Sequence, residues 1–280
     1  AEFVKAKTSG VTAIGVRDFL VAYNINLNTT STRRANAIAF DMREAGRVKR
    51  KGDPITGEIE NDKDGNPIRI PGKLKAVKGI GWYIEEYGIA QISYNLTDIK
   101  ITSIHKAFDE TLIAAQERGI RVTGSELVGL VPLKAMLDAG KYFLNKQNRS
   151  LGVSEDEIIK IAVKSLGLDD LKPFNPKEKI IEYMMEDSSS SPLINLTLTN
   201  FAKETAGESP APGGGSIAAY VGTLGVALGT MVANLSSHKR GWDDKWEYFS
   251  DWAEKGQVYK NQLLKLVDED TNSFNAIMDS

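Results

Sequence analysis

Two parts of the sequence combine residue types that could perform chemistry. The first is a glycine-rich stretch, Ser209-Pro210-Ala211-Pro212-Gly213-Gly214-Gly215-Ser216, and we expect a helix to begin directly after it. The first free N–H groups of a helix, together with the helix dipole, can hold an anion. Gly213 to Ser216 are therefore a candidate site for a carboxylate or a phosphate. The same residues would suit a tight turn between two helices equally well. The stretch lacks the Gly-Lys-Ser/Thr ending of a Walker A loop and the strand that precedes a dinucleotide fingerprint.

The second part is the acidic sequence Asp268-Glu269-Asp270. Asp270 lies four residues after Leu266 and four before Phe274, which places it on a mostly apolar face of the helix expected there. A carboxyl group on such a face is costly to bury unless it is paired or functional. Asp270 is therefore a candidate general acid or base. The alternative is a partly solvated acid in a cluster of three.

The composition excludes several other kinds of site. The 280 residues include no cysteine and only two histidines, His105 and His238, which excludes a cysteine nucleophile, disulfides and a multi-histidine zinc site. Both histidines are more typical of structural positions. The formal net charge of -2 argues against sequence-independent binding of nucleic acid. The content of 41% hydrophobic and 26% charged residues is ordinary for a soluble globular protein.

The first half of the chain predicts an α+β subdomain. Its hydrophobic patterns indicate strands and helices in the order strand, helix, strand, strand, helix, strand, at about 19–27, 31–45, 77–85, 89–96, 103–118 and 120–123. That order is the ferredoxin-like, βαββαβ arrangement. Residues 48–72 are polar and broken by glycine and proline, so we expect a surface loop or a small hairpin with a tight turn at Asp64-Gly65.

Only helices are expected afterwards. Appended helices are predicted at about 132–144, 154–166 and 177–185, and the serine run before Pro192 is the clearest linker. Three further helices are predicted at about 196–206, 215–236 and from 242 to the end. The expected domains are therefore 1–186, a linker at 187–193, and an all-α segment at 194–280 that forms part of a bundle. Ser216 to Leu235 contains no charged residue, so a membrane span is an alternative to a central bundle helix.

Several strings resemble one family, the formiminotransferase-cyclodeaminases. In the first half these are Phe19-Leu20-Val21-Ala22-Tyr23-Asn24-Ile25-Asn26-Leu27, Gly79-Ile80-Gly81-Trp82-Tyr83, Val128-Gly129-Leu130-Val131-Pro132-Leu133-Lys134 and Pro176-Lys177-Glu178-Lys179-Ile180-Ile181-Glu182-Tyr183. Ala211-Pro212-Gly213-Gly214-Gly215-Ser216 is similar to the opening of the cyclodeaminase domain. The resemblance covers nearly the whole chain, except the loop at 48–70.

The resemblance implies two activities. The transferase moves a formimino group from formiminoglutamate to tetrahydrofolate, which acts as a cosubstrate, in histidine breakdown. The deaminase closes the product to methenyltetrahydrofolate and releases ammonia. The folate-side segment entering this subdomain corresponds to Phe3, Val4, Lys5, Ala6, Lys7, Thr8, Ser9 and Gly10, and the family's catalytic aspartate matches Asp270.

The resemblance also implies limits. The transferase's catalytic histidine belongs to another subdomain, and neither His105 nor His238 matches it. Both ends of the chain look cut, so we expect half of one site and the beginning of another, with little or no transferase activity. We further expect no metal, no nucleic-acid or membrane partner, a homodimer or higher homo-oligomer, and a cytoplasmic location. The alternative function is a non-catalytic, ferredoxin-like module that binds a small ligand.

Overall fold

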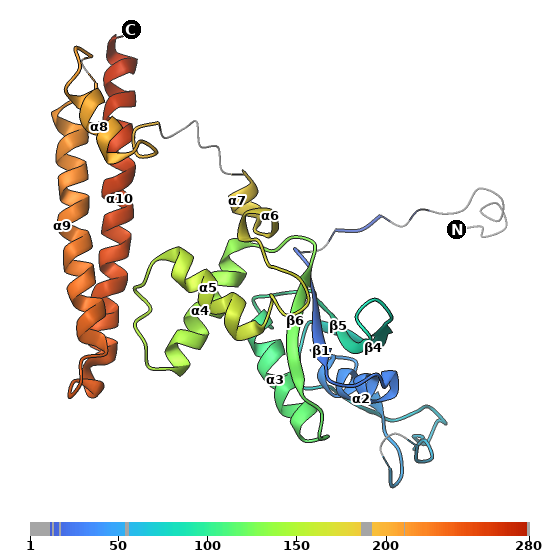
Figure 1. Cartoon of the computed structure of the whole chain (residues 1–280). Helices are drawn as coiled ribbons and strands as arrows, with labels where there is room; N and C mark the ends of the chain where they lie inside the picture. Colours follow the sequence, from blue (N-terminus) through green and yellow to red (C-terminus); the bar gives the residue numbers. More distant parts are fainter. Residues whose placement is uncertain are drawn as a thin grey trace. The chain divides into compact units, whose positions relative to one another are not determined.

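The computed structural model describes residues 12, 14–16, 18–53, 56–185, 192–209 and 211–278 (Figure 1). The chain forms two compact units, Ala1–Val128 and Gly129–Ser280. Each unit is described separately below.

The first unit is built on a four-stranded sheet. The strands β1 (Val21–Leu27), β4 (Val77–Ile84), β5 (Ile89–Leu96) and β6 (Val122–Val128) lie in the order β4-β5-β1-β6. Every pairing is antiparallel. Helix α2 (Thr32–Met42) follows β1, and α3 (Ile104–Gln116) follows β5. This confirms the α+β class and the βαββαβ order that the sequence predicts. The last strand continues to Val128, well beyond the predicted 120–123.

One face of the sheet is apolar and covered by the two helices. Tyr23 and Tyr94 lie fully buried on this face, and their hydroxyls bond to Ser125 Oγ and Thr111 Oγ1, each at 2.9 Å. Burial raises the pKa of both tyrosines far above the usual value. Both phenols therefore remain neutral and act as packed hydrogen-bonding groups.

Helix α2 packs directly on the edge strand β4. Asn36 uses its side-chain amide to donate to the carbonyl of Gly81 at 3.0 Å and to accept from the N–H of Gly81 at 2.9 Å. A Cβ atom at Gly81 would lie 2.3 Å from the backbone nitrogen of Asn36. Glycine at position 81 thus lets the helix approach the sheet, and Asn36 pairs an edge strand that would otherwise expose unpaired backbone groups.

The polar segment after α2 forms the small hairpin that was one of the two predicted alternatives. Strands β2 (Arg47–Val48) and β3 (Arg69–Ile70) pair antiparallel. At the far end, Asp62 Oδ1 accepts from the N–H groups of Asp64 and Asn66, at 2.9 and 2.8 Å. Gly65 there has φ +82°. The turn forms where Asp64-Gly65 predicts it, because glycine tolerates this left-handed backbone.

The second unit begins with α4 (Leu133–Lys146) and α5 (Glu155–Leu166). The single helix predicted at 177–185 is instead two short helices, α6 (Pro176–Lys179) and α7 (Ile181–Met185). Ile180 between them is extended and fully buried, and it forms a parallel bridge with Val131. This backbone pairing interrupts the helical pattern locally.

The rest of this unit consists of α8 (Leu198–Thr205), α9 (Gly214–Ser237), a 3₁₀ turn η2 (Asp243–Lys245) and α10 (Trp246–Met278). Helices α9 and α10 run side by side (Figure 1). A Cβ atom at Gly256 on α10 would lie 2.0 Å from Thr230 Oγ1 on α9. This glycine therefore permits the close approach of the two helices.

Helix α9 is long and apolar enough to cross a membrane by length and composition. It packs on α10 along one side, and several of its large apolar residues are exposed. These are Val221, Leu224, Leu228, Met231, Val232 and Leu235.

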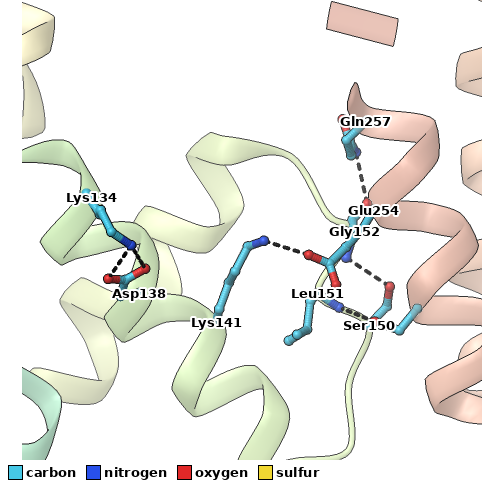
Figure 2. A network of polar contacts seen from close by, with 9 residues as sticks. Lys134, Asp138, Lys141, Ser150, Leu151, Gly152, Glu254 and Gln257 are labelled. Carbon is cyan, nitrogen blue, oxygen red and sulfur yellow. Dashed lines mark hydrogen bonds and ion pairs between the residues drawn. The ribbon is translucent and has the colours of Figure 1, made fainter. Parts of the chain in front are cut away.

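Within the second unit, the loop after α4 bonds to α10 (Figure 2), and it also bonds to α9. The carbonyl of Gly152 accepts from Gln257 Nε2 and Asn234 Nδ2, both at 2.9 Å. Lys141 Nζ lies 2.6 Å from Glu254 Oε2. A Cβ atom at Gly152 would meet the backbone of Ala253 at 2.3 Å, so only glycine fits at this contact.

Candidate functional site

The two candidate parts of the sequence meet at the start of α9. The N–H of Ser216 donates to Asp270 Oδ2 at 2.8 Å, and Ser216 Oγ lies 3.2 Å from the same oxygen. Ser216 Oγ also donates to the carbonyl of Val267 at 2.7 Å and lies 3.1 Å from Thr271 Oγ1. The anion at this helix N-terminus is thus the carboxylate of Asp270 itself, in the position that the helix dipole favours.

Gly215 makes room for this carboxylate. A Cβ atom at position 215 would lie 2.2 Å from Asp270 Oδ1, while one at Gly214 would meet nothing within 4 Å. The glycine-rich stretch turns the chain between α8 and α9, and the N–H of Ser216 at its end meets the carboxylate of Asp270. Binding of a substrate anion by Gly213 to Ser216 stays a prediction.

Asp270 does not lie on a buried apolar face in the described part of the chain. Leu266 is 46% exposed, Phe274 is 37% exposed, and Asp270 is exposed as well. The buried position on this turn is Val267, which packs beneath Ser216. The face is apolar in residue type, as the sequence predicts, but α9 covers it only along Val267, so Leu266, Asp270 and Phe274 stay exposed. An exposed carboxylate is accessible to a substrate.

The buried acid of the cluster is Asp268. It is 5% exposed and accepts from the backbone N–H groups of Leu193 and Ile194, at 2.8 and 3.3 Å. Asp268 thereby ties the segment before α8 to α10. Its role is structural, and the spacing of apolar residues gave no sign of it.

A second polar group lies on the sheet face opposite the helices in the first unit. Asn26 and Gln91 are in register and buried, and Gln91 Nε2 donates to Asn26 Oδ1 at 2.7 Å. Gln91 Oε1 is buried and has no partner among the described residues. Glu126 Oε2, part-exposed on β6, lies 3.5 Å from Asn24 Nδ2.

Larger side chains lie at the edges of the same face. Trp82 is in register with Gln91 and is 43% exposed. Val128 on β6 is also exposed. The face thus offers an acid, amides and an exposed aromatic ring. Its signal in the sequence is the alternation in Tyr23-Asn24-Ile25-Asn26, where the polar residues fall on one side of a buried strand.

Among the remaining predicted residues, only the two histidines lie in the described part of the chain, and neither is a member of these two groups. Phe3 to Gly10 lie outside the described residues. His105 Nε2 lies 2.8 Å from Ser103 Oγ at the start of α3, and His238 follows the end of α9. No group of three or more His, Asp or Glu side chains among the described residues could hold a metal ion.

Comparison with known sequences assigns both halves of the chain. The family model described as "Formiminotransferase domain" matches residues 22–186, and "Formiminotransferase-cyclodeaminase" matches residues 197–280. The chain therefore belongs to the formiminotransferase-cyclodeaminase family.

Individual relatives agree with this assignment. Formimidoyltransferase-cyclodeaminase of Mus musculus is 40% identical over 272 residues, which are 97% of this chain and 46% of that protein. The protein of the same name from Dictyostelium discoideum is 35% identical over 98% of this chain and 47% of its own length. Glutamate formimidoyltransferase of Streptococcus pyogenes is 33% identical over 50% of this chain and 39% of that protein. The chain spans about half the length of the first two relatives.

Proposed function

We propose that this chain is part of a bifunctional folate enzyme. One activity transfers a formimino group from N-formimino-L-glutamate to tetrahydrofolate. The other cyclodeaminates 5-formiminotetrahydrofolate to 5,10-methenyltetrahydrofolate and releases ammonia, in histidine degradation. The observation that carries the proposal is the contact between Asp270 and the start of α9, within the segment that the cyclodeaminase family model matches.

The cyclodeamination needs two proton transfers that one carboxyl group can perform. N10 of the folate attacks the carbon of the protonated formimino group, so that an N10–C bond forms and the C=N double bond becomes a single bond. Asp270 accepts the N10 proton and returns it to the amino nitrogen. The C–N bond then breaks, ammonia leaves, and the positive charge stays on the methenyl product. The N–H of Ser216 at the helix N-terminus holds Asp270 for this exchange, and Gly215 leaves room for its carboxylate. General acid–base catalysis of this kind contributes about 10²- to 10⁴-fold.

The folate half of the proposal involves the first unit. Phe3 to Gly10 would supply the folate-side segment, as in the family that the sequence resembles. The polar sheet face supports a folate-binding role for this unit, because Glu126 can accept from N–H donors of a pterin ring and Trp82 can stack on an aromatic group. These residues lie on strands at opposite edges of the sheet, about 14 Å apart by strand spacing. An elongated ligand could contact both.

The proposal includes partners and location. The substrates are formiminoglutamate and folates, and the chemistry requires no metal. We propose a cytoplasmic homodimer or higher homo-oligomer with no nucleic-acid or membrane partner. The exposed apolar residues of α9 would then be covered by protein.

The 280-residue chain is expected to bind a reduced folate weakly and to turn over no formiminoglutamate. The matched transferase region contains His105 alone, and that histidine does not correspond to the family's catalytic one. Titration with 5-formyltetrahydrofolate should quench tryptophan fluorescence with a Kd of about 0.1–1 mM. Trp82→Phe should remove most of this change. The other three tryptophans, at 242, 246 and 252, belong to the second unit and lie outside the region that the transferase family model matches.

Two outcomes would contradict this proposal. One is the absence of folate binding together with saturable binding of an unrelated metabolite, which would favour the non-catalytic ferredoxin-like module. The other is turnover of formiminoglutamate and tetrahydrofolate by this chain alone, which would contradict the predicted lack of transferase activity.

A further inference from the structure

A pocket rich in arginine lies in the first unit, on the helix side of the sheet. Its volume is about 420 Å³, within the range of roughly 300–1,000 Å³ common for small-molecule sites. One wall is formed by α2 with Arg33 and by Arg43, the residue directly after this helix. The other wall is the β2–β3 hairpin with Arg47, Arg50 and Arg69. No carboxylate is among the described residues that line the pocket.

Most of the guanidinium N–H groups remain available. Arg47 forms an ion pair with Asp41 at 2.5 Å, and Arg50 Nη1 donates to the carbonyl of Gly57 at 2.7 Å. The guanidinium groups of Arg33 and Arg69 have no polar partner in the part of the chain that the structure describes. Since each guanidinium carries five N–H donors, the pocket holds a large surplus of donors over acceptors.

Arg43 is held in place at the back of the pocket. Its Nε donates to the carbonyl of Gly46 at 3.0 Å, and its guanidinium carbon lies 4.0 Å from the centroid of the Phe40 ring. Partial burial, and then the positive charge of Arg69, lower the pKa of Arg43. Like charges are therefore gathered around an open space, and a bound anion would relieve their repulsion.

We propose that this pocket is a second ligand site, which binds a small molecule carrying two or more phosphate groups. Planar guanidinium groups match phosphate oxygens with paired N–H donors, which makes arginine the residue best suited to this recognition. Ala37, Phe40 and Val48 add an apolar wall, so the ligand can also carry an uncharged organic part. The site is independent of the proposed folate chemistry, since it lies on the opposite side of the sheet from Glu126 and Trp82.

The test is isothermal titration of the 280-residue chain with inorganic triphosphate, at low and at physiological ionic strength. We expect one saturable site that weakens as salt increases. Arg69→Gln and Arg33→Gln should each reduce affinity about tenfold to a hundredfold, because each removes charge-assisted hydrogen bonds. Both residues are exposed and unpaired, so the circular dichroism spectrum and Tm should stay unchanged.

The matched control is Arg34→Gln. Arg34 is the next residue on the same exposed turn of α2 and does not line the pocket. Its loss removes the same charge and should change the affinity for triphosphate less than about twofold.

The proposal is overturned if triphosphate shows no saturable binding, or if Arg34→Gln weakens binding as much as Arg33→Gln. Equal affinity for citrate would overturn the assignment to phosphate. Binding of triphosphate should persist in the presence of 5-formyltetrahydrofolate, whether or not the folate itself binds.

Discussion

Replacement of Gly81 by alanine is expected to destabilise the first unit by about 3 kcal/mol. The new Cβ would lie 2.3 Å from the nitrogen of Asn36 and 2.4 Å from the carbonyl carbon of Ala35. Both are backbone atoms, so α2 must move away from β4, and overpacking of this kind costs about 1–3 kcal/mol or more. The movement also breaks the two hydrogen bonds that Asn36 makes with Gly81.

Urea unfolding followed by circular dichroism measures this effect. Asn36→Ala removes the hydrogen bonds without the steric conflict and should cost about 1–2 kcal/mol. Gly225→Ala is the chemical control, because nothing lies within 4 Å of a Cβ atom at that position on α9. It should stabilise the helix by up to about 1 kcal/mol. Neutral surface changes alter the free energy of unfolding by roughly 0.5 kcal/mol or less. If the free energy of unfolding of Gly81→Ala differs from that of the original protein by no more than this, the close packing of α2 on β4 is contradicted.

Replacement of Asp270 by asparagine is expected to reduce cyclodeamination about 10²- to 10⁴-fold with little loss of stability. The asparagine carbonyl can still accept from the N–H of Ser216, so the start of α9 keeps a partner. It cannot take up and return a proton. The change thus separates the chemical role of the carboxylate from its structural role.

The measurement is the rate of ammonia release from 5-formiminotetrahydrofolate, in a protein that contains this sequence and has cyclodeaminase activity. The control is Glu269→Gln, the neighbouring acid, whose ion pair with Lys265 lies on the exposed side of α10. The rate of Glu269→Gln should stay within about twofold of the rate of the original protein, because an exposed ion pair contributes little to stability. A full rate for Asp270→Asn would show that another group transfers the protons.

The sequence predicted the fold where local patterns and tertiary packing agree. The hydrophobic pattern of residues 89–96 gave the bounds of β5 (Ile89–Leu96) correctly, and the helix predicted at 154–166 matches α5, whose N-cap is Ser154. Ile180 shows the limit, because its bridge to Val131 is a contact between distant residues that no helical periodicity reveals. The same holds for β6, in which Gly124, Ser125 and Glu126 weaken the apolar pattern.

The candidate sites, like the fold, were predictable only where a local pattern of residues was sufficient. Gly213 to Ser216 and Asp270 were recognised separately, from backbone freedom and from spacing, and the structure brings Ser216 and Asp270 within hydrogen-bond distance. The different roles of Asp268 and Asp270 depend on which side of α10 is covered by α9 and by the segment at Leu193. The arginine pocket joins residues of α2 to a hairpin whose pairing a polar, glycine-rich segment did not specify.

For the first unit, the central claim is that it carries the folate-binding half of a transferase site, on the sheet face that presents Glu126. Its most direct test is calorimetric titration of the chain with 5-formyltetrahydrofolate, compared with Glu126→Gln. Loss of the negative charge should weaken binding about tenfold, because a hydrogen bond to a charged acceptor is stronger than one to a neutral amide. Glu117→Gln, an exposed acid after α3, should bind as the original chain does. Equal affinities for all three proteins would contradict the claim that folate lies on this face.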